Sequence, residues 1–191
     1  NLGNSYYRLN KIGLAIWAYR NATKYSPRDK DIAHNLKIAE AQRTDRIVSP
    51  PLFVIHEFYR KIKSSFTIFE LSLLGGILVF ILSLIWTIKR SIDLKTKFLG
   101  IFFQFFLVIT GFIHILILDS ISDRKKNENK AVVISKVDAM SSPSDGDNKI
   151  LFYINEGALV EVIDEKNQWM EIILIDGKRG WAASNALRKM Q

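Results

Sequence analysis

The stretch that decides the organisation of this chain is Leu71 to Ile88, LSLLGGILVFILSLIWTI, which runs for 18 residues without a charge. A second run, Phe98 to Leu118, has 21 residues, of which Gln104 and His114 are the strongly polar members. A helix needs roughly 20 apolar residues to cross the hydrocarbon of a bilayer. The sequence therefore predicts two transmembrane helices, at about 71–88 and 98–118, within a membrane region at 67–118.

The connection between the two runs, residues 89–97, is short and charged. It predicts a hairpin turn, with both flanking regions on the same side of the membrane. The alternative of two buried core helices fails because no other part of the chain is large enough to cover them. The loop holds four Lys or Arg residues against seven on the outer flanks, so the charge rule does not decide which side this is. His114 and Asp119 suggest a weaker alternative, a proton or ion site for transport.

Residues 48–66, ahead of the first run, carry apolar side chains at helical spacing. The pattern follows Pro50-Pro51, and basic residues are interspersed in it. This is typical of a linker that ends in an amphipathic helix lying in the membrane interface. A helix packed on the N-terminal region is the alternative.

The N-terminal region, residues 1–47, spaces small and large residues as two packed helices require. Gly3 lets a second helix approach closely, Ala15 is small enough to lie opposite, and Pro27 cannot continue the second helix. Tyr6 and Tyr19 fill the space around them. This pattern resembles the tetratricopeptide repeat, which displays a peptide groove. We expect residues 31–43 to form a capping helix and further repeats to lie upstream.

The resemblance to the repeat implies which polar side chains face the groove. Asn4 and Asn35 match asparagines that bind a peptide backbone or a terminal carboxylate in peptide-clamping repeats, although both are also common consensus residues. Tyr7 and Arg8 point toward the same groove by spacing, and are equally compatible with an exposed surface.

The last region, residues 131–191, changes to a β pattern after a linker at 119–130. Alternating apolar residues and tight turns predict a small β-barrel closed by Gly180-Trp181. The segments Glu156-Gly157, Trp169-Met170-Glu171-Ile172 and Gly180-Trp181 resemble the bacterial SH3 fold over Ala131 to about Met190. Tyr153, Trp169 and Trp181 are candidates for an aromatic groove that binds a peptide or a glycan strand. Filling of the barrel core is the alternative, and the stronger one for Trp181.

Composition narrows the function classes. The chain has no Cys, its three His fall in different segments and no phosphate loop occurs, so we expect no catalytic, metal or cofactor site. The net charge of +8 divides into +7 for residues 1–66, +2 for 67–118 and −1 for 119–191. Lipid head groups account for this basic excess near the membrane, and no nucleic-acid-binding motif accompanies it.

The fold class predicted is therefore a multidomain membrane protein: an α-helical repeat fragment, a two-helix transmembrane hairpin and an SH3-like β-barrel. This order is similar to the BatE group of membrane proteins, encoded with the Bacteroides aerotolerance genes. The resemblance implies a two-pass inner-membrane protein with periplasmic domains. It also implies a non-enzymatic scaffold that assembles with von Willebrand-type membrane proteins under envelope or oxidative stress. A cell-wall sensor that binds peptidoglycan through the SH3 module is the alternative.

Overall fold

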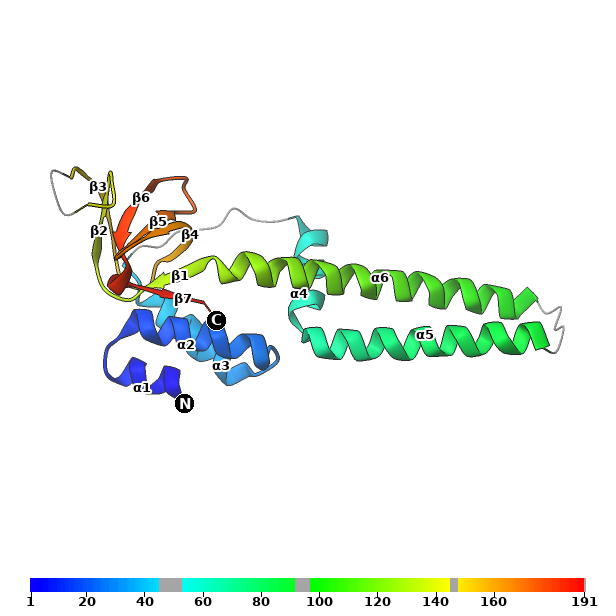
Figure 1. Ribbon diagram of the computed structural model, residues 1–191. Coiled ribbons are helices and arrows are strands. Elements are labelled where there is room, and N and C mark those ends of the chain that lie inside the picture. Colours follow the sequence, from blue (N-terminus) through cyan, green and yellow to red (C-terminus); the bar gives the residue numbers. More distant parts are fainter. Residues whose placement is uncertain (45–52, 92–96, 145–147, 191) are drawn as a thin grey trace. The chain divides into compact units, whose positions relative to one another are not determined.

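The computed structural model describes residues 1–44, 53–91, 97–144 and 148–190. It divides into two compact units, one of residues 1–53 and 125–191 and one of residues 54–124 (Figure 1). The first unit combines the N-terminal helices with the C-terminal sheet, and the second contains the two long apolar helices.

The helical part of the first unit has three helices, α1 (Leu2–Arg8), α2 (Ile12–Tyr25) and α3 (Lys30–Ala41). The α1–α2 contact is as close as Gly3 predicts, because a Cβ added at Gly3 would lie 2.5 Å from Tyr19 Cε1. The Asp29 side chain caps α3 by accepting from the N–H of Asp31 and Ile32. The helical character of this region is confirmed, whereas its membership of a repeat solenoid remains a prediction.

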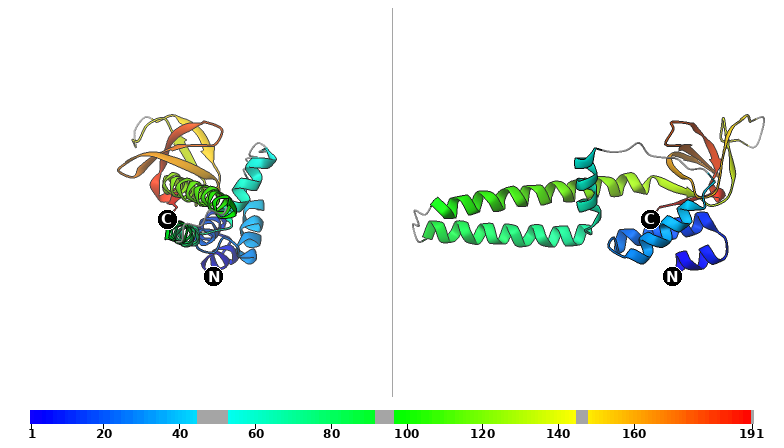
Figure 2. Two further views of the ribbon diagram at one scale, coloured as in Figure 1. Left: turned by 90° about the vertical axis from the view of Figure 1, so that its right-hand side faces the viewer. Right: turned by 180° about the vertical axis from the view of Figure 1, so that it is seen from behind.

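The β part of the first unit is a seven-stranded sheet with the order β3-β2-β6-β5-β4-β1-β7, in which the neighbouring strands pair antiparallel. Figure 2 shows that the strands curl around one another. The strands are β1 (Lys130–Val133), β2 (Val137–Met140), β3 (Ile150–Ile154), β4 (Leu159–Lys166), β5 (Trp169–Ile173), β6 (Arg179–Ala183) and β7 (Leu187–Lys189), with a 3-10 turn η1 (Ser184–Ala186) before β7. This antiparallel sheet agrees with the predicted SH3-like fold.

The sheet encloses its own apolar core. Alternate residues of its strands point inward and are almost fully buried, among them Ala139, Ile154, Val160, Ile172 and Ala182. Gly157 and Gly177 have φ of +87° and +86°, values that L side chains rarely adopt, so glycine permits both turns. Residues 145–147, between β2 and β3, lie outside the described residues.

A second core joins the helices to the sheet. Ile16 and Trp17 of α2 cluster with Val132 of β1 and Met190, which follows β7. Gly13 approaches the sheet so closely that an added Cβ would lie 2.4 Å from the Val133 carbonyl oxygen. The helices and the sheet of the first unit therefore share buried surface.

The second unit consists of α4 (Val54–Ser64), α5 (Ile68–Ser91) and most of α6 (Lys97–Glu128). Thr67 and Glu70 form a capping box, in which each side chain bonds the other residue's backbone N–H and fixes the start of α5. Residues 119–130, expected as a linker, are helical as far as Glu128, and β1 starts two residues later. Within the segment 48–66, residues 48–52 lie outside the described residues and the remainder contains α4.

The segments Ile68–Arg90 and Gly100–Glu128 are long and apolar enough to cross a membrane, and each contains most of a predicted span. The two helices lie side by side (Figures 1 and 2), and the rings of Trp86 and Phe103 are 5.7 Å apart. Gly75 is buried against Ile113 and His114 of α6. Leu71 and Gly75 thus supply the buried positions at the start of α5.

Candidate functional site

The polar residues predicted for a peptide groove lie on α1 and α3, and the structure brings two of them together. Asn35 Nδ2 donates to Asn4 Oδ1 at 3.2 Å, and the Tyr19 hydroxyl donates to the same oxygen at 2.5 Å. Burial raises the pKa of Tyr19, and the nearby Tyr7 raises it further, so the hydroxyl stays a donor at neutral pH. The Asn4 oxygen therefore holds three helices together.

The other two groove candidates have different environments. The Tyr7 hydroxyl accepts from Gln42 Nε2 at 2.5 Å, which links α1 to the residue after α3. Arg8 is exposed at the end of α1. Asn4 and Tyr7 thus both have contacts within the helical part of the unit. A peptide-binding role for the set stays a prediction.

On the sheet, two of the three aromatic candidates share the outer face of adjacent strands. Trp169 of β5 pairs with Ala183 of β6, and Trp181 lies two residues along β6 on the same face. Such diagonal neighbours lie within reach of each other's aromatic side chains. The two tryptophans therefore lie as diagonal neighbours on one face of the sheet, and we call them the tryptophan pair.

The register changes the interpretation of Trp181. Its neighbours Gly180 and Ala182 point inward, Gly180 toward Ala139 and Ala182 into the barrel core. Because side chains alternate along a strand, Trp181 faces outward and does not plug the barrel. It is nevertheless only 8% exposed, and the Lys166 ammonium lies 5.4 Å from its ring centroid.

Charged side chains border the tryptophan pair on the same face. Glu171, opposite Trp181, forms an ion pair with Arg179 at 2.7 Å. The carboxylate raises the pKa of Arg179 by hydrogen bonding and by charge attraction. A ligand on this face would meet the partly exposed Trp169 beside charges of both signs, whereas Trp181 is largely covered.

Tyr153 belongs to a different part of the sheet. It lies on β3 opposite Asp138 of β2, and its side chain is 69% exposed. The Lys136 ammonium lies 5.4 Å from its ring centroid. In the sheet order, β2 separates β3 from the strand that carries Trp181. The predicted set of three aromatics thus divides into the tryptophan pair and a separate exposed tyrosine.

Trp17 is an interface residue that the sequence pattern did not reveal. Its indole Nε1 donates to the Lys189 carbonyl oxygen at 2.7 Å, and the Arg188 guanidinium lies 4.9 Å from the ring centroid. The Gly13 N–H also donates to Glu156 Oε1 at 2.7 Å. These contacts fasten α2 to β7 and to the turn before β4, so this side of the SH3 module is occupied within the chain.

The second unit contains an ion cluster beside the long helices. Lys63 Nζ lies 2.6 Å from both Asp119 Oδ2 and Asp123 Oδ2, and the Tyr59 hydroxyl donates to Asp119 at 2.8 Å. Burial acts to lower the pKa of Lys63, but the two carboxylates together outweigh it and the net pKa is raised. His114, considered with Asp119 for transport, contacts the Thr110 carbonyl oxygen through Nδ1 at 2.8 Å. Asp119 is therefore engaged by α4.

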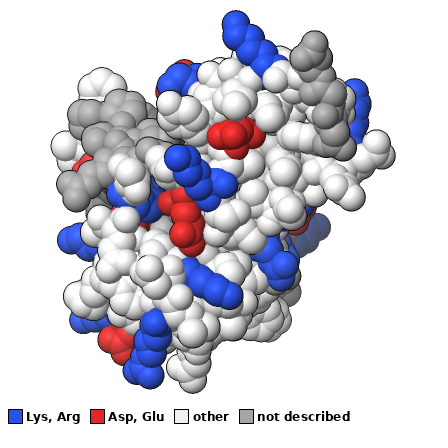
Figure 3. All heavy atoms as spheres, turned by 90° about the vertical axis from the view of Figure 1, so that its left-hand side faces the viewer, with Lys and Arg blue, Asp and Glu red and all other residues white. Residues whose placement is uncertain are grey.

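We also looked for metal ligands among the described residues and for clustered basic side chains on the face drawn in Figure 3. In the part of the chain that the structure describes, no three His, Cys, Asp or Glu side chains gather as a metal site requires. On the face shown in Figure 3, Lys and Arg are separated by uncharged surface and several lie near acidic side chains. Proteins bind a nucleic-acid backbone through basic residues clustered in a patch or stripe, and this face does not have that arrangement.

Comparison with known families identifies the C-terminal module. Residues 136–189 match the family model of the bacterial SH3 domain. A search of the curated proteins found no match to the chain. The chain thus carries a bacterial SH3 domain, which suggests binding to protein or to the cell wall.

Proposed function

We propose that the protein is a non-enzymatic, membrane-anchored adaptor that binds other proteins through its SH3 domain and its N-terminal helices. The observation that carries the proposal is the shared core of Ile16, Trp17, Val132 and Met190. Because this core holds the two binding modules in one compact unit, a partner can contact both at once. The two long apolar helices supply the anchor.

The overall order of modules supports a more specific proposal for the complex in which this adaptor acts. The helices belong to a tetratricopeptide-type array, and the protein acts in an envelope or oxidative-stress complex of the BatE type with von Willebrand-type membrane proteins. Both soluble regions then lie in the periplasm. Alkaline phosphatase fusions at Gln191 and within residues 89–97 test this orientation. Activity at Gln191 alone supports it, and activity in the loop alone reverses it.

Co-purification of the full chain from native membranes tests the adaptor function. Two surface variants are compared with wild type, Trp169→Ala in the tryptophan pair and Arg8→Glu on α1. Tyr25→Ser is the matched control, because Tyr25 is 76% exposed and belongs to neither surface. We expect reproducible partners whose yield falls in a surface variant and not in the control. Recovery of the protein alone, or equal yields throughout, would contradict an adaptor.

Cell-wall binding is the second candidate, and the tryptophan pair favours it, because aromatic faces bind sugar rings and peptides alike. The test is sedimentation of the full chain in detergent with purified sacculi. The full chain is required because Val132 and Met190 pack against α2. Retention that Trp169→Ala abolishes supports this function, whereas equal retention of the Trp169→Ala variant and wild type removes it.

A further inference from the structure

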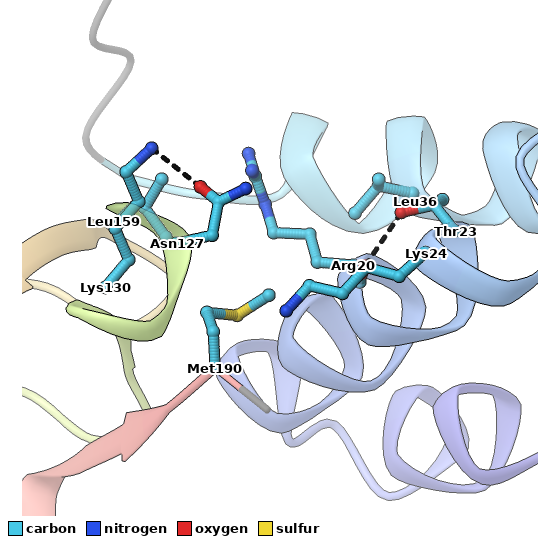
Figure 4. Close-up of a pocket in the computed structure, with 8 residues that line it drawn as sticks. All are labelled: Arg20, Thr23, Lys24, Leu36, Asn127, Lys130, Leu159 and Met190. Carbon is cyan, nitrogen blue, oxygen red and sulfur yellow. Dashed lines mark hydrogen bonds between the residues drawn. The ribbon is translucent and has the colours of Figure 1, made fainter. Parts of the chain in front are cut away.

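A hollow of about 190 Å³ lies in the first unit, where α2, α3, the end of α6 and the sheet meet (Figure 4). Among the described residues that line it, three are basic, Arg20, Lys24 and Lys130, and none is acidic. Figure 4 shows the Arg20 and Lys130 side chains on either side of Asn127. The hollow is distinct from the tryptophan pair and from the residues predicted for the peptide groove.

One donor of the partly exposed Arg20 guanidinium has no partner among the described residues. Its Nη2 bonds Glu40 Oε1 at 2.5 Å, but its Nε is buried and has no hydrogen-bond partner among the described residues. Leaving a buried donor without a partner is unfavourable, so this guanidinium has hydrogen-bonding capacity left for a ligand.

The remaining lining specifies what kind of acceptor fits. Lys130 Nζ donates to Asn127 Oδ1 at 2.9 Å, so the partner that the structure gives this ammonium is a neutral amide. Leu36, Leu159 and Met190 add apolar side chains to the lining. A ligand would therefore combine anionic oxygens with a small apolar group.

We infer that this hollow binds a phosphate group that carries a small apolar substituent. Phosphate oxygens accept several charge-assisted bonds at once, from the guanidinium and the ammonium groups, while the substituent lies against Leu159 and Met190. The hollow of about 190 Å³ has room for several water molecules, each of which occupies about 30 Å³ in the liquid, and so for a ligand of this small size. The inference does not rest on the adaptor function.

Isothermal titration of the full chain in phosphatidylcholine nanodiscs, in a phosphate-free buffer, tests the site. The probes are inorganic phosphate and phenyl phosphate, and we expect saturable binding with phenyl phosphate the tighter of the two. Lys130→Gln should weaken binding on the order of 10-fold, the loss expected for one charged hydrogen bond. Lys24→Gln is a second lining variant, in case Lys130→Gln does not fold.

Lys11→Gln is the control, because it removes the same charge from an exposed residue outside the lining. Repeating the titration in nanodiscs that contain phosphatidic acid distinguishes the two sources of the phosphate. If phenyl phosphate binds equally well in these discs, the ligand of the site is a soluble phosphate ester. If its binding is lost, phosphatidic acid occupies the site and the ligand is a lipid head group. The inference is overturned if neither probe binds saturably in phosphatidylcholine discs, or if the lining variants bind as tightly as Lys11→Gln.

Discussion

Replacing Trp17 with Phe tests whether the helices and the SH3 domain share one core. The indole N–H bonds the Lys189 carbonyl oxygen at 2.7 Å, and the side chain is only 6% exposed. Phe keeps most of the apolar surface but cannot donate, so the carbonyl loses its partner. Leaving a buried acceptor unpaired costs roughly 1–3 kcal/mol. The smaller ring also weakens the contact with the Arg188 guanidinium.

For a unit of this size, a loss of about 2 kcal/mol lowers the melting temperature by roughly 5–10 °C. Hydrogen exchange of the full chain in detergent locates the loss. We expect faster exchange both in α2 and at the amides of β1 and β7, for example the Met190 N–H that bonds the Lys130 oxygen. Trp86→Phe is the control, since Trp86 is 56% exposed on α5. This variant should change neither the melting temperature of the first unit nor the exchange in α2, β1 and β7.

The informative outcome is the location of the change rather than its size. If Trp17→Phe speeds exchange in α2 while β1 and β7 keep their wild-type protection, the helices and the sheet unfold independently. The shared core of Trp17, Val132 and Met190 would then be wrong. A melting temperature equal to that of wild type would refute the role assigned to the indole hydrogen bond.

Three further changes have defined outcomes. Gly3→Ala places a Cβ 2.5 Å from the Tyr19 ring, so we expect a loss of about 1–3 kcal/mol in thermal unfolding, whereas Gly76→Ala, with no atom within 4 Å, should be neutral. Thr67→Ala removes the cap of α5 and should cost about 1 kcal/mol, which denaturant titration in mixed micelles measures; an unchanged midpoint would contradict the capping box. The pKa of Lys63 in the folded protein is raised above its ordinary value of 10.5. Its contribution to the stability of the fold is therefore fully present below pH 10.5 and is lost as the pH rises through the folded pKa. The difference in melting temperature between wild type and Lys63→Met should therefore shrink above pH 10.5, and a constant difference would exclude the ion cluster as its cause.

Features set by local pattern were predictable from the sequence. The two apolar runs needed only length and composition, and the close approach at Gly3 needed only the spacing of small and large residues on two adjacent helices. The Gly180-Trp181 pair indicated the SH3 fold, which the match over residues 136–189 supports. The orientation of Trp181 was less accessible, because it depends on the register between β5 and β6.

Contacts between distant segments left no signal in the sequence. Trp17 and Lys189 are 172 residues apart, and an aromatic residue on a helix gives no indication of its partner. Lys63 and Asp119 belong to segments that were predicted separately, as an interfacial helix and as a linker, so their contact was not expected. Asn4 shows the converse, because a residue selected for ligand binding also holds the helices together.

The shared core also changes how two weak binding surfaces act. Domains joined by a flexible linker gain avidity that depends on the linker length, and they lose part of it to the freedom of the chain. Here the contacts of Trp17 and Gly13 hold α2 against the SH3 domain, so the helical surface and the tryptophan pair keep a fixed spacing. A partner that matches this spacing binds both surfaces without ordering a linker, whereas a partner of another geometry binds only one. Specificity in the proposed adaptor therefore depends on the interface between its modules as well as on their binding residues, and Trp17→Phe should weaken a two-site partner more than a one-site partner.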